Sequence, residues 1–70
     1  MLEQDIFKAI EEEIPICGEY FQEIISDIQI KRIDFENSIF KECKFENCDF
    51  SNSSFSNIEM IKCNFKNCKF

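Results

Sequence analysis

Residues 33–57 read IDFENSIFKECKFENCDFSNSSFSN, and a period of five residues runs through this stretch. Phenylalanine occupies every fifth position, at Phe35, Phe40, Phe45, Phe50 and Phe55. An amphipathic helix places apolar residues every three or four positions, and a half-buried strand places them every two. A period of five fits neither pattern, so the sequence predicts a repeat architecture.

The period extends to both sides of this stretch as two columns. The large apolar column comprises Ile30, Phe35, Phe40, Phe45, Phe50, Phe55, Met60, Phe65 and Phe70. The small column lies two positions earlier in each block and comprises Ile28, Ile33, Ser38, Cys43, Cys48, Ser53, Ile58, Cys63 and Cys68. The remaining positions are mostly polar. Residues 28–70 therefore divide into eight blocks of five and a partial ninth.

The blocks IDFEN, SIFKE, CKFEN and CDFSN resemble those of the pentapeptide-repeat family. The resemblance implies an all-β solenoid, a right-handed quadrilateral parallel β-helix, in which four blocks make one coil of about 20 residues. Residues 28–70 would then form about two coils, with both columns making an inward ladder. Residues one coil apart should stack at about 4.8 Å. The expected pairs are Phe50 on Ile30, Phe55 on Phe35, Met60 on Phe40, Phe65 on Phe45 and Phe70 on Phe50.

Asparagine recurs at the last position of the blocks, at Asn37, Asn47, Asn52, Asn57 and Asn67. An asparagine side chain bonds readily to nearby backbone, and the residue tolerates left-handed backbone angles. The asparagine column therefore predicts the corners of the coil.

Residues 1–27 are predicted to form an acidic helical cap, separate from a solenoid domain at 28–70. Residues 2–14 have helical apolar spacing, at Leu2, Ile6, Phe7, Ile10 and Ile14, and Pro15 should end this helix. A second short helix is expected from the spacing of Tyr20, Phe21, Ile24, Ile25 and Ile28. The segment has eight acidic residues and one lysine, a net charge of −7, whereas residues 28–70 carry +1. Capping an open solenoid end is the favoured role, and an acidic docking site is the alternative.

The C-terminal end is predicted to be open, because the sequence stops at Phe70 in the middle of a block. An open end presents unpaired strand edges. We therefore expect either the N-terminal part of a longer, truncated solenoid, or an end that pairs with another chain, including a homodimer through this end.

Four cysteines, Cys43, Cys48, Cys63 and Cys68, form the pattern C-x4-C-x14-C-x4-C, which a four-thiolate zinc site could also produce. All four lie in the small column, where serine takes equivalent places, so packing as small buried side chains is the favoured interpretation. Disulfides Cys43–Cys63 and Cys48–Cys68 are within reach, but parallel side-chain directions disfavour them. Cys17 lies outside the columns and has no assigned role. No metal and no cofactor are predicted.

The composition argues against an enzyme. The chain has no histidine, and no serine lies beside a base that would activate it. One glycine leaves no Gly-rich phosphate loop, and lysines alternating with acids give no stripe for direct nucleic-acid binding. Five cysteines, without a signal peptide or an apolar span, predict a cytoplasmic protein away from the membrane.

The predicted function is that of a non-catalytic solenoid module, structural or protein-binding, with an unknown protein partner. The resemblance implies an alternative, because one subset of the family comprises quinolone-resistance and topoisomerase-protecting proteins. Under that alternative the chain is a bacterial protein that mimics DNA and binds DNA gyrase.

Overall fold

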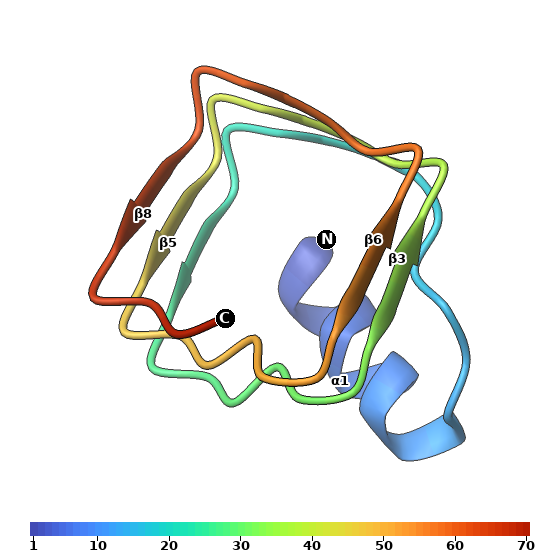
Figure 1. Cartoon of the computed structure of the whole chain (residues 1–70). Coiled ribbons are helices and arrows are strands. Elements are labelled where there is room, and N and C mark those ends of the chain that lie inside the picture. The colour runs from blue at the N-terminus through green and yellow to red at the C-terminus, as the bar shows by residue number, and fades with distance from the viewer.

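The computed structural model describes residues 1–70, which form one helix followed by eight short strands. The helix α1 spans Leu2–Glu12. The strands are β1 (Glu19–Phe21), β2 (Ile24–Ser26), β3 (Asp34–Glu36), β4 (Ile39–Lys41), β5 (Lys44–Glu46), β6 (Ser54–Ser56), β7 (Glu59–Ile61) and β8 (Asn64–Lys66). Figure 1 shows the strand-bearing chain tracing a four-sided outline, with α1 across its interior. No helix has both the length and the apolar character needed to span a membrane.

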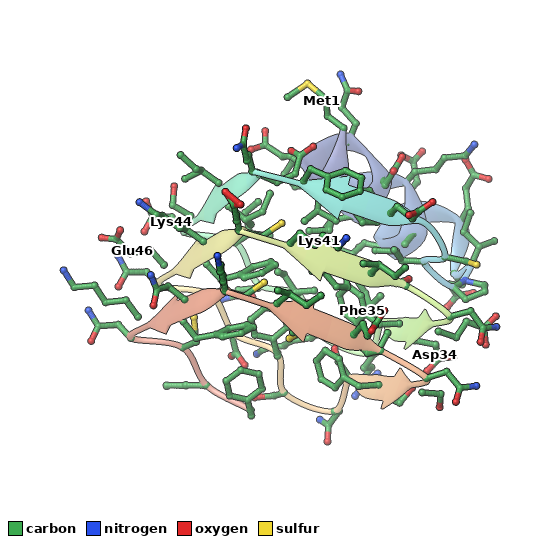
Figure 2. The ribbon with its side chains drawn as sticks, turned by 90° about the horizontal axis from the view of Figure 1, so that it is seen from above. Met1, Asp34, Phe35, Lys41, Lys44 and Glu46 are labelled. Atoms are coloured by element: carbon green, nitrogen blue, oxygen red, sulfur yellow. The ribbon has the colours of Figure 1, made fainter.

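All strand pairs are parallel. One sheet has the order β1-β4-β7, a second has β2-β5-β8, and the third pairs β3 with β6. Partners in these sheets are 20 residues apart, as Phe40 is opposite Met60 and Phe45 is opposite Phe65. The fourth side is linked by isolated bridges through Gln29, Asp49 and Lys69. The chain therefore stacks on itself as a parallel β-solenoid, and Figure 2 shows the stacked strands from the side.

We divide the solenoid into three layers, namely layer 1 (residues 16–34), layer 2 (35–54) and layer 3 (55–70). The second helix expected from sequence is wrong, because β1 and β2 occupy that segment. Tyr20 and Ile25 continue the large apolar column upstream and lie opposite Phe40 and Phe45. Pairing with β4 and β5 satisfies the backbone hydrogen-bonding groups of this segment. The segment therefore forms strands in the five-residue repeat, although the spacing of its apolar residues also fits a helix.

This pairing places two strands within the segment predicted as the cap. The cap was expected to occupy residues 1–27, but α1 ends at Glu12 and the first solenoid strand begins at Glu19. Two sheets have three strands each, one more than two coils would supply.

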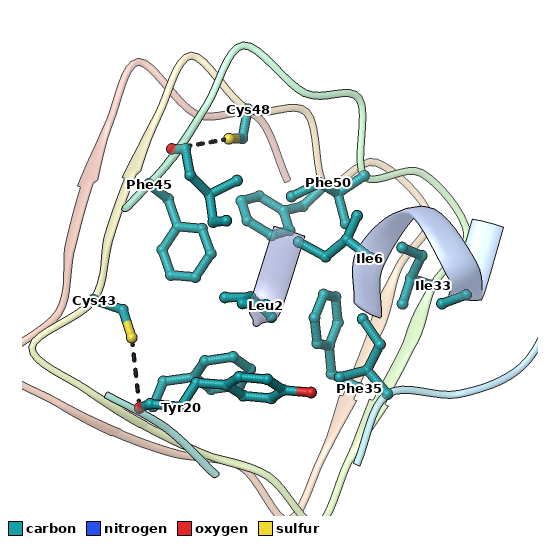
Figure 3. Packing of buried hydrophobic residues seen from close by; sticks show 14 residues of the cluster. Leu2, Ile6, Tyr20, Ile33, Phe35, Cys43, Phe45, Cys48 and Phe50 are labelled. Atoms are coloured by element: carbon teal, nitrogen blue, oxygen red, sulfur yellow. Dashed lines mark hydrogen bonds between the residues drawn. The ribbon is translucent and has the colours of Figure 1, made fainter. Parts of the chain in front are cut away.

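The inward side of α1 closes the N-terminal end of layer 1. Leu2, Ile6 and Ala9 lie one helical turn apart and are at most 4% exposed. Figure 3 shows Leu2 and Ile6 among the solenoid side chains, near Tyr20 and Phe35. This contact removes one end of the apolar column from water.

The sequence assigned three further apolar residues to the packed side of α1, and that assignment is wrong. Phe7, Ile10 and Ile14 are 51%, 42% and 40% exposed. The side of the helix that carries Leu2, Ile6 and Ala9 contacts layer 1, whereas Phe7, Ile10 and Ile14 stay partly exposed to water.

Residues with positive φ recur every fifth position along the layers. They are Gln22, Asp27, Arg32, Asn37, Glu42, Asn47, Asn52, Asn57, Lys62 and Asn67. The left-handed geometry predicted for the asparagines is confirmed. Their amides also bond between layers, because Asn47 Nδ2 donates to Asp27 Oδ1 and Asn57 Nδ2 donates to Asn37 Oδ1, each at 3.2 Å.

The predicted aromatic stacks are confirmed. Ring centroids of Phe35 and Phe55 are 5.1 Å apart, those of Phe45 and Phe65 are 4.9 Å apart, and the planes in each pair are within 7° of parallel. Full burial of each ring contributes about 2–3 kcal/mol, and stacking adds about 0.5–1.5 kcal/mol. The inward column is therefore the main source of stability in the solenoid.

Candidate functional site

The candidate site is the apolar surface of layer 3 that faces away from layer 2. It is formed by Phe55 of β6, Met60 of β7, Phe65 of β8, Phe70 on the fourth side, and Ile58 of the small column. We call these five residues the end face. Phe55, Phe65 and Phe70 are 39%, 36% and 69% exposed, and Met60 is 39% exposed.

Each end-face side chain has a fully buried counterpart in layer 2. Phe50 stacks on Phe70 with ring centroids 5.0 Å apart, yet Phe50 is only 2% exposed. Phe45 and Phe65 repeat this relation. The residue type and backbone phase are the same, so the exposure comes from the missing cover on one side.

The outer edges of the strands surround the end face. Strands β6, β7 and β8 are the last strands of their sheets and pair only with layer 2. An edge strand presents backbone donors and acceptors that another strand can pair with. The end face therefore combines an apolar centre with three free strand edges, which is a surface suited to receiving another layer.

Lysines form the outer rim of layer 3. Lys66 lies opposite Glu46, and Lys69 lies opposite Asp49. Lys62 occupies the corresponding corner above Glu42, whose N–H donates to the Ile61 carbonyl. We call Lys62, Lys66 and Lys69 the lysine rim. With Glu59, these are the charged residues of layer 3, which give it a net charge of +2.

Asp49 shows how the acids of layer 2 are held. The Ser51 hydroxyl and the Ser51 N–H donate to its carboxylate, and Lys31 Nζ lies 3.6 Å from Asp49 Oδ2. The hydrogen bonds from Ser51 and the charge of Lys31 lower the pKa of Asp49. The carboxylate is therefore ionised near neutral pH.

The small column consists of hydrogen-bond donors as well as packing residues. Cys43 Sγ donates to the Tyr20 carbonyl at 3.6 Å, and Cys48 Sγ donates to the Ile25 carbonyl at 3.7 Å; Figure 3 marks both bonds. Ser53 Oγ donates to the Ile30 carbonyl at 2.6 Å in the same way. These side chains thus tie one layer to the carbonyls of the layer before it.

Among the side chains of this protein, the cysteines are the ones whose residue type most suggests a metal site. Burial raises the pKa of the Cys43 and Cys48 thiols, and a metal binds the thiolate. All five cysteines are free thiols in the structure, and no group of three or more potential ligands is gathered in one place. The S–H groups of Cys43, Cys48, Cys63 and Cys68 donate to carbonyl oxygens.

The ladder residues predicted from sequence fall into three groups. The buried members are Ile30, Ile33, Phe35, Ser38, Phe40, Cys43, Phe45, Cys48 and Phe50. Half-buried members are Ile28, Ser53, Ile58, Cys63 and Cys68, and the exposed members lie on the end face. Sequence reasoning missed the lysine rim, whose signal is an acid followed by a lysine at 20-residue spacing.

Comparison with known protein families gives a match over residues 3–70 to the model of the SV2A/B/C luminal domain. The comparisons with curated proteins and with solved structures give no match.

Proposed function

The chain belongs to the family of the SV2A/B/C luminal domain, and from this premise we propose that it is a non-catalytic solenoid module that binds protein through its end face. One observation carries the proposal. The inward column is covered by α1 at one end and lies open at Phe55, Met60, Phe65 and Phe70 at the other. Contiguous exposed apolar residues mark interaction surfaces.

We further propose that the layers are coils of a right-handed quadrilateral β-helix built from pentapeptide repeats. Three features support this proposal. The strand register is 20 residues, positive φ recurs every fifth residue from Gln22 to Asn67, and four sides follow one another along the chain. A partner that matches the end face then needs the same four-sided outline.

The proposed binding mode is strand addition with apolar contact. The outer edges of β6, β7 and β8 supply backbone hydrogen bonds, which give affinity in this mode. The end-face side chains supply the apolar contact, as the buried Phe35 and Phe45 do between layers 1 and 2. The interface would thus repeat the contact by which the layers hold one another.

A peptide with the sequence of residues 35–54 is the probe for this function, because it carries the ladder of layer 2. Labelled peptide should bind the protein, and binding should slow amide hydrogen exchange in β6, β7 and β8. Phe65→Lys should abolish binding, since Phe65 lies on the end face. Phe7→Lys changes an exposed side chain of α1, at the other end of the solenoid, and should bind normally. Protection located in β1 and β2 would contradict the proposal.

The charges of the solenoid bear on the alternative function, DNA mimicry toward gyrase. A DNA mimic needs a continuous acidic wall to compete for a basic groove. Here layer 2 places Glu46 and Asp49 beside Lys66 and Lys69 of layer 3. Alternation of charge between layers favours the protein-binding module, and a gyrase supercoiling assay tests the alternative.

We propose that the cysteines remain reduced in the functional protein, as expected of a cytoplasmic chain. The word luminal in the family description refers to the SV2A/B/C proteins. Each thiol of the small column is a hydrogen-bond donor to a carbonyl, as Cys43 is to Tyr20, and oxidation would remove that donor. Alkylation of native protein followed by mass spectrometry should find five free thiols, and a lower number would contradict the reduced state.

A further inference from the structure

We infer that the end face prefers a β-layer that carries carboxylates over the lysine rim. This inference rests on the function proposed above and names the chemistry of the protein partner, a β-layer with an apolar inward column and acidic outward residues. It comes from a pattern that recurs on two sides and at one corner of the solenoid.

The pattern is an acid of layer 2 beside a lysine of layer 3. Glu46 lies opposite Lys66 in the β5–β8 pair, and Asp49 lies opposite Lys69 on the fourth side. At a corner, Lys62 of layer 3 follows Glu42 of layer 2 by 20 residues, and the Glu42 N–H donates to the neighbouring Ile61 carbonyl. Opposite charges directly across neighbouring strands attract, and like charges in those places repel.

The lysine rim has these acids in register on only one side. Lys62, Lys66 and Lys69 are exposed and lie on two sides and one corner of layer 3. A layer added to β6, β7 and β8 in parallel register would bring its own three outward residues next to the same lysines. Carboxylates there would place opposite charges across neighbouring strands, as the register of layers 2 and 3 does, whereas lysines would place like charges one strand spacing apart.

A second copy of this chain fits less well than such a partner. Its N-terminal end is closed by α1, with Leu2 and Ile6 buried. Its C-terminal end carries the same lysine rim, so two copies meeting through their end faces would oppose lysines to lysines. The charges therefore favour an acidic layer over self-association.

The peptide of residues 35–54 supplies the matched test, because parallel addition would place its Glu42, Glu46 and Asp49 over the rim. The control peptide has these three residues changed to lysine and keeps every apolar residue. We expect the control to bind about tenfold or more weakly at about 0.05 M salt, and we expect the difference to shrink at about 1 M salt. A Lys62→Glu, Lys66→Glu, Lys69→Glu variant should reverse the preference.

The outcomes separate this inference from the proposed function. If both peptides bind equally and protect β6, β7 and β8, the end face is a binding surface but the acidic preference is wrong. If neither peptide binds the folded protein, the proposed function itself fails. A preference for the acidic peptide that the triple variant leaves unchanged would overturn the role of the lysine rim.

Discussion

The two ends of the solenoid present the same inward column to different surroundings. At the N-terminal end, Tyr20 and Ile25 of layer 1 are 8% and 1% exposed beneath α1. At the C-terminal end, Phe65 and Phe70 are 36% and 69% exposed, although they hold equivalent places in the repeat. The contribution of a ladder residue to stability therefore depends on whether both of its sides are covered by a layer or by the helix. Its position within the five-residue repeat does not determine that contribution.

The largest effect should come from a charge placed within the covered part of the column. Phe50→Asp buries a carboxylate among the rings of Phe35, Phe45 and Phe70. An unpaired buried charge costs about 4 kcal/mol or more, which exceeds the stability that a small domain normally has in reserve. We expect no cooperative thermal transition by circular dichroism.

Phe70→Asp is the matched control for this change. Phe70 is 69% exposed, so water still solvates a carboxylate at that place. The variant should fold and lose about 1 kcal/mol of unfolding free energy, mainly from the stack on Phe50. Equal losses in the two variants would contradict the contrast between covered and uncovered ladder residues.

The next prediction tests whether α1 covers the N-terminal end of layer 1. Ile6→Ala removes a fully buried side chain from the inner side of α1 and should cost about 2–4 kcal/mol. Phe7→Ala, one residue away but 51% exposed, should change stability by about 0.5 kcal/mol or less. Urea denaturation of both variants measures the difference. A larger loss for Phe7→Ala would mean that α1 packs with its other side.

The fold could be predicted from sequence in the part of the chain where phenylalanine marks every repeat. Phe35, Phe45 and Phe55 predicted the period and the stacking partners correctly, and the asparagine column predicted the left-handed corners. The first part of layer 1, before residue 28, was missed because Tyr20 and Ile25 continue the column with side chains other than phenylalanine, and the spacing from Tyr20 to Ile28 also satisfies a helix. The pairing with layer 2 decides between the two patterns, and that contact is not local in sequence.

The candidate site was predictable only in part. The apolar residues of the end face follow from the five-residue phase, but the lysine rim depends on which residues face one another 20 positions apart. Lys66 and Glu46 appear in the sequence as ordinary alternating charges. Their relation becomes visible once the register places them on neighbouring strands.

A smaller effect tests how the cap is fastened to layer 1. Tyr20 Oη donates to Asp5 Oδ2 at 2.8 Å, the side-chain hydrogen bond that links α1 to a strand. Tyr20→Phe removes this bond and should cost about 1 kcal/mol near neutral pH. Chemical denaturation measures the loss, and an unchanged unfolding free energy would show that the bond contributes nothing.

The same substitution predicts a pH dependence. Burial, and then the hydrogen bond to Asp5, raise the pKa of Tyr20 above its ordinary value of 10.0 in the folded protein. The protonated phenol is thus favoured by folding, so its contribution is complete below about pH 10 and is lost as the pH rises toward the folded pKa. The advantage of the wild type over Tyr20→Phe should shrink above about pH 10. An advantage that grows with pH would contradict this sign.

The smallest effect should come from a corner that layers 1 and 2 share. Arg32 and Asn52 occupy the same corner in layers 1 and 2, with φ of 61° and 63°. Left-handed angles cost most residues about 1–2 kcal/mol, and asparagine tolerates them better. Arg32→Asn should therefore raise the unfolding free energy by about 0.5 kcal/mol, and Asn52→Arg should lower it by a similar amount.

Thermal denaturation of the two corner variants gives opposite shifts in Tm if backbone geometry decides the choice of residue. The side chain of Arg32 is exposed, so its loss removes no buried contact. Shifts of the same sign would mean that the side chains make contributions of their own at this corner. Opposite shifts would show that the preference for asparagine at left-handed corners also holds in layer 1, which has no asparagine at its corners.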